Sequence, residues 1–391
     1  MIYIFLISLV LVVYLYLGYP IIIMLFSHLR RKRNYQLLEL PRISLIIAAF
    51  NEEVVIEKKI KNSLALNYPQ EKLEIIIAAD GSSDKTGEIV NPYKAKGVIL
   101  LLEPERKGKM AAMKRAVEKA NGEILVFSDA NNFYEEITFK YLVQPFADKA
   151  VGGTSGAKRI CDDKDQMSKS EGLYWKYESW IKKNESRLNT CTASAGEIFA
   201  MRKVLFKDPQ EFIINDDFYL LLSILKQGFK VIYVPEAKSW ERISADQKGE
   251  IIRRKRINAG RYQALFNGIE WLPWKKPVAI WQIFSHKFLR LFSPFLMILA
   301  LLSNAWLVFE GYPNAGYDNI QKGLLLFFLS QLGFYLLALL NPVIPQFSGG
   351  KALHFPAFLV NSNLAALQGF VSFINGSQSV LWERVKRRND G

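Results

Sequence analysis

The segment IIIAADGSSD, residues 75–84, joins a continuous apolar run to a turn that carries two carboxylates. The segment ILVFSDAN, residues 124–131, places an aspartate after an apolar run in the same way. Continuous apolar runs of this length are typical of strands in a parallel sheet that is buried on both faces. Because ligands bind such sheets beyond the carboxyl ends of the strands, we expect Asp80 and Asp129 to project into one crevice.

The acidic side chains of this crevice indicate the kind of ligand that it takes. A third acidic segment, Asn215-Asp216-Asp217, follows the first two, whereas the whole chain contains only 3 histidines. Oxygen ligands suit hard divalent cations, so Mg or Mn is the predicted metal. Such a cation favours a phosphorylated ligand, and a nucleotide is the predicted substrate.

Residues 41 to about 241 alternate short apolar runs with charged helical segments, which is typical of an α/β domain. The predicted strands are 43–49, 75–79, 98–102, 124–127, 151–160, 198–201 and 231–234. The predicted helices are 53–65, 85–95, 109–120, 168–183 and 217–226.

The N-terminal segment predicts a membrane anchor. Residues 1–27 contain no charged side chain and are followed by Arg30-Arg31-Lys32-Arg33. At about 1.5 Å rise per residue this run is long enough to span a bilayer. A cleaved signal peptide would carry its positive charge before the apolar run, so a retained anchor is favoured over it and over a buried soluble helix. Basic residues mark the cytoplasmic side, which places the N-terminus outside and the chain after Arg30 inside.

The C-terminal part predicts further membrane helices. Residues 278–291 mix cations with large apolar residues, which fits a helix lying in the membrane interface. Residues 292–309 and 323–340 predict a transmembrane hairpin. Residues 355–374 include polar amides and predict either a span or a re-entrant or interfacial helix. The predicted division is an anchor at 1–29, a cytoplasmic domain at 30–276 and a membrane region at 277–391.

The net charge of +14 indicates an anionic partner. Basic clusters lie near the apolar segments, at 253–256, 275–276 and 386–388, where anionic lipids would attract them. The chain has no zinc-ligand spacing, helix-turn-helix or aromatic RNA-binding motif, so membrane lipids rather than nucleic acid are the predicted partner.

The cysteines and histidines do not suggest a site of their own. Cys161 and Cys191 stand alone in the sequence, which predicts free thiols in a cytosolic domain. His28, His286 and His354 lie in or beside apolar segments, and none is expected to belong to a metal or nucleophile site.

Five motifs occur in an order that resembles the family 2 glycosyltransferases. They are SLIIAAFNEE at 44–53, DGSSD at 80–84, DAN at 129–131, GEIFAMR at 196–202 and NDD at 215–217. The similarity extends over residues 41–260 and the flanking apolar segments. This group contains membrane-anchored inverting enzymes related to cellulose, chitin, hyaluronan and poly-N-acetylglucosamine synthases. The resemblance implies a GT-A fold, which is a Rossmann-like domain with a mostly parallel sheet, and a UDP-sugar as donor substrate.

The resemblance also implies where the donor binds. Asp80 would hydrogen-bond the uracil, and the turn after the first strand would wall the base. The residues implied in that wall are Ala49, Asn51 and Glu52. Lys109, at the start of a helix, would meet a phosphate. Two alternatives stay open, since Asp80 could cap a helix that starts near position 83 and Lys109 could be a solvated cation.

Two further motifs imply the metal and the base. Asp129 and Asn131 stand where relatives carry Asp-x-Asp, the pair that holds the diphosphate and a divalent metal. An asparagine carbonyl can coordinate Mg or Mn but adds no charge, so weaker metal binding is expected. Asp217 stands in the position of the relatives' general base, and Asp216 beside it would raise its pKa by like-charge repulsion. The alternative is that both aspartates only cap the helix.

Processive relatives carry Gln-x-x-Arg-Trp after this point, whereas this chain has Arg253, Arg256 and Ile257 at the three defined positions. Arg256 would neutralise the departing diphosphate. Isoleucine cannot stack on an acceptor sugar as tryptophan does, which argues against a long polymer. The alternative for this basic run is a membrane-surface patch. The residues expected at the acceptor are Gly196, Glu197 and Arg253.

The sequence therefore predicts an inverting, non-processive glycosyltransferase at the cytoplasmic face of the cell membrane. It would move a hexose or N-acetylhexosamine from a UDP-sugar to a glycan or lipid-linked acceptor. Two alternatives stay open: a processive synthase of a secreted polysaccharide, and a non-catalytic nucleotide-binding partner of a synthase, which Asn131 and the absent Gln and Trp motivate. The donor sugar, the linkage and the oligomeric state are left open.

Overall fold

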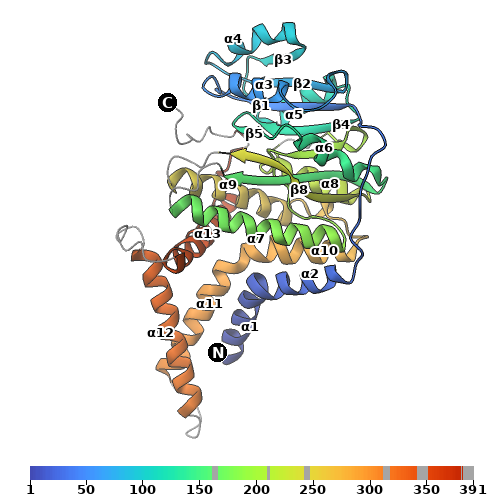
Figure 1. The fold of residues 1–391 in the computed structure, drawn as a ribbon. Helices are drawn as coiled ribbons and strands as arrows, with labels where there is room; N and C mark the ends of the chain where they lie inside the picture. Colours follow the sequence, from blue (N-terminus) through green and yellow to red (C-terminus); the bar gives the residue numbers. More distant parts are fainter. Residues whose placement is uncertain are drawn as a thin grey trace.

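The structure of the chain, a computed structural model, describes residues 1–160, 166–208, 212–241, 247–310, 318–340, 351–379 and 381. Within these residues the centre is an eight-stranded sheet with the strand order β3-β2-β1-β4-β7-β6-β8-β5 (Figure 1). The strands are β1 Ile43–Ala49, β2 Leu73–Asp80, β3 Val98–Glu103, β4 Ile124–Asp129, β5 Asn132–Tyr134, β6 Val151–Ile160, β7 Phe199–Arg202 and β8 Lys230–Glu241. Every predicted strand is confirmed, and β5 is an addition.

One half of the sheet, β3-β2-β1-β4, is parallel. β1 is buried along its whole length, as its continuous apolar pattern predicts. The register pairs Ala48 with Asp129 and Ala49 with Ala79, so Asp80 and Asp129 leave the sheet at the same edge. The mostly parallel α/β architecture is thereby confirmed.

The other half of the sheet is mixed. β7 is antiparallel to both β4 and β6, whereas β6 is parallel to β8. β8 continues to Glu241, beyond the end predicted at 234, and its last residues pair with β5. β5 directly follows the predicted metal motif. Its pairing with β8 therefore ties the turn between Asp129 and Asn132 to the β8 edge of the sheet.

Helices cover both faces of the sheet (Figure 1). They are α3 Ile56–Leu64, α4 Thr86–Val90, α5 Lys109–Lys119, α6 Thr138–Val143, α7 Gln166–Leu188, α8 Asp216–Lys226 and α9 Gln247–Phe266. α5 and α8 pack on the face that carries Ile46, and α3 and α6 pack on the face that carries Leu45 and Ile47. Alternate residues of β1 thus enter two separate cores, as the period of a strand requires.

The helix expected at 85–95 is shorter than predicted. α4 ends at Val90, and a 3-10 helix, Asn91–Lys96, follows it. Pro92 has no backbone N–H, so the helical hydrogen bond that an amide at this position would make is lost. α9, which contains the basic run 253–256, and α6 are helices that the sequence analysis did not assign.

Within the part of the chain that the structure describes, four helical runs are long and apolar enough to cross a membrane. They are Ile2–His28, Pro277–Phe309, Asn319–Leu340 and Pro356–Ile374. The first contains α1 Ile2–Val13 and α2 Tyr19–His28, and the second contains α10 Pro277–Ile283 and α11 Leu289–Phe309. In both runs a π-helical segment, Tyr14–Gly18 or Phe284–Phe288, joins the two parts. α12 Asp318–Leu340 and α13 Lys351–Ile374 complete the set.

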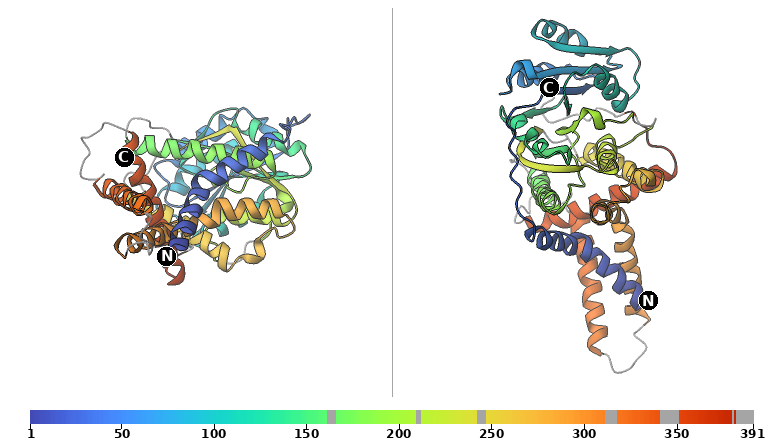
Figure 2. Two further views of the ribbon diagram at one scale, coloured as in Figure 1. Left: turned by 90° about the horizontal axis from the view of Figure 1, so that it is seen from below. Right: turned by 90° about the vertical axis from the view of Figure 1, so that its right-hand side faces the viewer.

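Figures 1 and 2 show that the two parts of each bent run point in different directions. α1, α11 and α12 extend away from the sheet, whereas α2 and α10 cross directly beneath the α/β domain. The predicted hairpin of 292–309 and 323–340 agrees with α11 and α12. The helix expected at 278–291 is continuous with α11 rather than separate, and its first part has the crosswise direction expected of an interfacial helix.

The N-terminal run does not behave as one straight anchor. Tyr19 and Ile23 of α2 are fully buried and pack against Ile181 of α7. This contact binds α2 to the domain, and Tyr177 of α7 also donates a hydrogen bond to the carbonyl oxygen of Tyr16, just before α2, at 2.8 Å. The predicted boundary at residue 29 therefore divides two elements that pack together.

α13 also contacts the α/β domain. It packs along α9, and a Cβ added at Gly369 would lie 2.8 Å from the Cβ of Asn258. A larger residue at 369 would push the two helices apart, so glycine permits this close approach. The apolar run at 356–374 thus lies against the helix that carries the basic residues.

Candidate functional site

A cavity of about 480 Å³ opens where the acidic segments meet. Its wall includes the turn after β4, the start of α5, the loop 193–197, the start of α8 and one side of α9. The predicted site residues that line it are Glu52, Lys109, Asp129, Asn131, Gly196, Glu197, Asp216, Asp217, Arg253 and Arg256. Ala49, Asn51 and Asp80 lie outside the lining.

Lys109 lies at the centre of the acidic groups. Its Nζ is 2.8 Å from Asp129 Oδ1 and 3.0 Å from Asp216 Oδ2. Burial alone would lower the pKa of this lysine, but the two carboxylates outweigh burial and raise it. Lys109 is therefore a charged group that joins two acidic segments, and the alternative of a solvated cation is wrong.

Asp216 and Asp217 occupy the first turn of α8. Asp216 contacts Lys109 and lies 3.9 Å from Arg256, whereas burial and then Asp216 raise the pKa of Asp217 to about 6, against the opposing effect of Lys109. The expected like-charge effect is confirmed in direction, although burial is the larger cause. A role limited to capping the helix does not account for the contacts of Asp216 with Lys109 and Arg256.

Gly196 keeps the space beside Asp217 open. A Cβ at this position would lie 3.4 Å from the Cβ of Asp217 and 3.6 Å from Lys109 Nζ. Glycine thus lets the loop 193–197 pass close to the aspartate without filling the cavity beside it. Ser194 of the same loop donates a hydrogen bond to the carbonyl oxygen of Asp217 at 3.0 Å.

Asp80 is fully buried and its carboxylate is engaged inside the protein. It accepts hydrogen bonds from the backbone N–H groups of Lys107 and Gly108 at 3.1 and 2.7 Å, and from Arg115 at 3.0 Å. Asp80 therefore holds the loop that leads into α5 and places Lys109 at the cavity. The contact of Asp80 with a uracil stays a prediction.

The alternative of Asp80 as a helix cap is wrong. α4 begins at Thr86, and it is Asp84 that accepts the hydrogen bond of the Thr86 N–H, at 3.0 Å. A capping side chain must lie next to the first turn of its helix, and Asp80 is still part of β2.

The turn after β1 is tied to the DGSSD turn. Asn51 has a positive φ of 53° and its Oδ1 accepts a hydrogen bond from the Ser83 N–H at 2.9 Å. The Glu52 N–H donates to Thr86 Oγ1 at 2.8 Å. Ala49 is buried at the end of the strand. The three residues predicted to wall a base thus form one rigid edge, of which Glu52 reaches the cavity.

Asp129 and Asn131 fit the oxygen chemistry of a divalent cation. Both line the cavity, and the side chain of Asp129 is 38% exposed there. Among the described residues, no three His, Cys, Asp or Glu side chains gather as a complete protein metal site. The residues present therefore suit a cation that takes its remaining ligands from a bound diphosphate.

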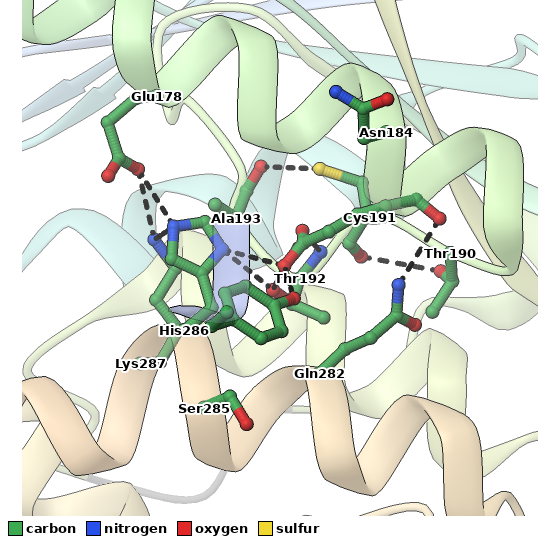
Figure 3. Close-up of polar contacts among 12 residues, drawn as sticks. Glu178, Asn184, Thr190, Cys191, Thr192, Ala193, Gln282, Ser285, His286 and Lys287 are labelled. Carbon is green, nitrogen blue, oxygen red and sulfur yellow. Dashed lines mark hydrogen bonds and ion pairs between the residues drawn. The ribbon is translucent and has the colours of Figure 1, made fainter. Parts of the chain in front are cut away.

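A buried polar network that reaches the cavity wall at Glu178 and Lys287 is not among the sequence predictions (Figure 3). His286 lies between two carboxylates, with Nδ1 2.7 Å from Glu185 Oε1 and Nε2 3.1 Å from Glu178 Oε2. Glu185 also accepts hydrogen bonds from Tyr19 of α2 at 2.5 Å and from the Thr192 N–H at 3.0 Å. The sequence analysis considered His286 only for a metal or nucleophile site and did not predict this structural network.

This network connects α2 and the Phe284–Phe288 segment to Thr192, which directly precedes the loop 193–197. Burial alone would raise the pKa values of Glu178 and Glu185, but Lys287 and Arg290 keep the pKa of Glu178 lowered. The contact with His286 and the hydrogen bonds from Tyr19 and Thr192 keep the pKa of Glu185 lowered. Thr192 is two residues from Ser194, which contacts Asp217. The signal available in the sequence was His286 itself, because a titratable residue inside an apolar run usually has a partner.

Cys191 is a free, buried thiol, as predicted, and burial raises its pKa to about 12. Cys161 and the basic cluster 386–388 lie outside the described residues.

Comparison with known proteins identifies the domain. Residues 44–208 match the family model described as Glycosyl transferase family 2. The chain is 28% identical over 323 residues to "Probable glycosyltransferase YdaM" of Bacillus subtilis (strain 168), covering 76% of this chain and 72% of that protein. It is 26% identical over 243 residues to the poly-beta-1,6-N-acetyl-D-glucosamine synthase of Staphylococcus aureus (strain COL), covering 61% of this chain and 58% of that protein.

A solved structure shares the fold over almost the full length. The mannosyltransferase PcManGT from Pyrobaculum calidifontis, in complex with GDP-Man and Mn2+, superposes with a TM-score of 0.72. The match has 20% sequence identity and covers 96% of this chain and 100% of that chain. At this identity the similarity shows the GT-A fold. The chain therefore carries a glycosyltransferase family 2 domain on a GT-A fold.

Proposed function

We propose that this protein transfers a hexose or an N-acetylhexosamine from a UDP-sugar, with inversion, to a glycan or lipid-linked acceptor. The observation that carries the proposal is the position of Asp217, a carboxyl group with a pKa raised to about 6, in one cavity with Lys109 and Asp129. A base with a pKa near the working pH transfers protons most effectively. The family supports sugar transfer, and the cavity supports the division of roles.

The side chains suggest one displacement step. Asp217 accepts the proton of the acceptor hydroxyl while the acceptor oxygen forms a bond to the anomeric carbon. The bond from that carbon to the diphosphate oxygen breaks on the opposite face, which inverts the configuration. Lys109 and Arg256 offer positive charge to the departing diphosphate. A Mg or Mn ion, when bound, supplies further charge for this group, and Asp129 and Asn131 are the residues that would hold it.

The choice of UDP rests on the resemblance of the motifs rather than on a contact. PcManGT was solved with GDP-Man and Mn2+, so a screen must include both nucleotides. We expect purified full-length protein to release UDP from a UDP-sugar in the presence of Mn or Mg and an acceptor extract. Release of GDP from GDP-mannose instead would contradict the UDP assignment, and nucleotide binding without any release would favour the non-catalytic partner.

The membrane arrangement is part of the proposal. We place the α/β domain on the cytoplasmic side because Arg30 to Arg33 follow the first apolar run. The apolar helical runs among the described residues and the crosswise course of α2 and α10 beneath the domain support a protein whose active site faces the membrane surface. Anionic lipids are the proposed partners of its basic helix α9.

Processive synthesis of a secreted polysaccharide is the second candidate. The similarity to a poly-beta-1,6-N-acetyl-D-glucosamine synthase favours it, whereas Ile257, which lines the cavity where processive relatives carry tryptophan, favours short products. Mass spectrometry of products made with excess donor separates the two. We expect one or a few added sugars, and a ladder reaching long polymer would support the second candidate.

A further inference from the structure

The cavity has an aromatic wall to which the proposed reaction assigns no role. Tyr174 and Trp175 of α7 line it, as does Ile257 of α9. Trp271 and Trp274 do not line it. Trp271 is buried against Tyr219, and the indole of Trp274 donates to the carbonyl of Ile269 at 2.9 Å.

Trp175 is held in place by its neighbours. The Trp175 ring lies edge-on to the Tyr174 ring, with 5.4 Å between the ring centres. Lys158 Nζ lies over the Trp175 ring, 5.3 Å from its centre. The Tyr174 ring in turn packs against the Phe358 ring of α13, with 5.3 Å between the ring centres. A ring fixed in this way loses little conformational freedom when a ligand packs against it.

Enclosed polar groups lie on the same side of the cavity. Trp175 Nε1 and Glu197 Oε1 are enclosed, and neither has a hydrogen-bond partner within the part of the chain that the structure describes. Glu197 Oε1 forms an ion pair with Lys158 Nζ at 3.5 Å, and Lys158 also pairs with Glu241, so the indole N–H of Trp175 is the group that is left unsatisfied. A buried indole N–H normally finds a partner, so this group indicates that a polar ligand completes the wall.

An aromatic face bordered by a carboxylate, an ammonium group and an N–H donor is suited to a sugar ring. The C–H groups of a sugar pack on the ring face, and its hydroxyls bond the polar groups at the edge. A sugar-free lipid phosphate would use the cations but would leave the ring face and Glu197 without a purpose.

We propose that Trp175 is the platform on which the terminal sugar of the acceptor stacks, with Glu197 and Lys158 bonding its hydroxyls beside Asp217. The inference rests on the proposed function and deepens it, because it requires that the accepting end of the acceptor is itself a sugar. Trp175 then supplies, from a different helix, the stacking surface that Ile257 cannot.

The test compares acceptor kinetics in full-length protein purified in detergent. The variants are Trp175→Ala, Trp175→Phe and, as a matched control outside the cavity, Trp274→Ala. The acceptor probes are octyl glycosides of glucose, galactose, mannose and N-acetylglucosamine, with farnesyl phosphate as the sugar-free probe. KM for each probe and KM for the donor are measured from nucleotide release.

Trp175→Ala should raise the KM for the accepted glycoside about tenfold, since the free energy that aromatic stacking adds corresponds to about a tenfold change in affinity. Trp175→Phe should recover most of the affinity, Trp274→Ala should match wild type, and the donor KM should not change in any variant. An unchanged glycoside KM in Trp175→Ala, or transfer to farnesyl phosphate with no use of any glycoside, would overturn the inference but leave the transferase proposal intact. Absence of nucleotide release from wild-type protein with every probe would overturn both.

Discussion

At the scale of single residues, Lys109 forms ion pairs with two of the three aspartates at the cavity and none with the third, Asp217. It neutralises Asp129 and Asp216 directly, whereas burial and Asp216 raise the pKa of Asp217 to about 6. A base must be ionised to accept a proton, so kcat/KM should rise with pH through about pH 6 and then level off.

The variant Asp216→Asn tests this origin of the pKa. It removes the like charge beside Asp217 and leaves Lys109 to act on that carboxylate, and both effects favour the ionised form. The acid limb of the pH–rate profile should therefore move to lower pH. Profiles of wild type and variant at saturating metal provide the measurement, and an acid limb that stays in place would show that Asp216 does not tune the base.

A second prediction concerns Asn131. Asn131→Asp adds a second carboxylate beside Asp129, so the metal concentration that gives half-maximal activity should fall. The measurement is a Mn titration of nucleotide release after treatment with EDTA. Wild-type activity that persists in excess EDTA would contradict the proposed metal requirement.

The residue scale also shows what the sequence could predict. The contribution of Asp216 to the raised pKa of Asp217 was predictable because the two are neighbours in the chain, whereas the larger contribution of burial depends on the fold. The engagement of Asp80 was not, because its donors lie in the loop after β3 and in α5, namely the N–H groups of Lys107 and Gly108 and the side chain of Arg115. A strand-end aspartate looks the same in sequence whether it faces a ligand or holds a loop.

At the scale of elements, Glu185 joins three of them. It contacts Tyr19 of α2, His286 of the Phe284–Phe288 segment and Thr192, which precedes the loop 193–197. Glu185→Ala would leave His286 with one carboxylate fewer and the Thr192 N–H unpaired. Leaving a buried hydrogen-bonding group without its partner costs about 1 to 3 kcal/mol.

That loss should appear as a lower denaturation midpoint in detergent. Glu71→Ala is the matched control, because Glu71 is exposed and should change the free energy of unfolding by less than about 0.5 kcal/mol. Equal midpoints for the two variants would contradict the structural importance of the network.

Elements with a strong pattern were predictable, whereas their packing was not. The apolar strands and α11 followed from hydrophobic runs alone. The course of α2 did not, because the run 1–27 is apolar throughout and does not show that Tyr19 and Ile23 bind α7 instead of lipid. β5 has only three residues, too few for a periodic signal.

At the scale of the whole molecule, the basic residues after the first apolar run determine the proposed topology. Glu71 is exposed on the α/β domain, so Glu71→Cys, in a chain without the two native cysteines, provides a labelling site. It should resist a membrane-impermeant thiol reagent in intact cells and react after lysis. Labelling before lysis would place the domain outside and contradict the proposal.

The central claim is that Asp217 is the base of an inverting sugar transfer. Its most direct test is turnover and donor affinity of Asp217→Asn beside wild type, with the anomeric configuration of the wild-type product read by NMR. Loss of a general base costs about 10² to 10⁴ in rate, so turnover should fall by that factor while donor affinity stays near wild type and the product has inverted configuration. Retention of more than about a tenth of the wild-type rate, on that same scale, or a product with retained configuration, would contradict the account.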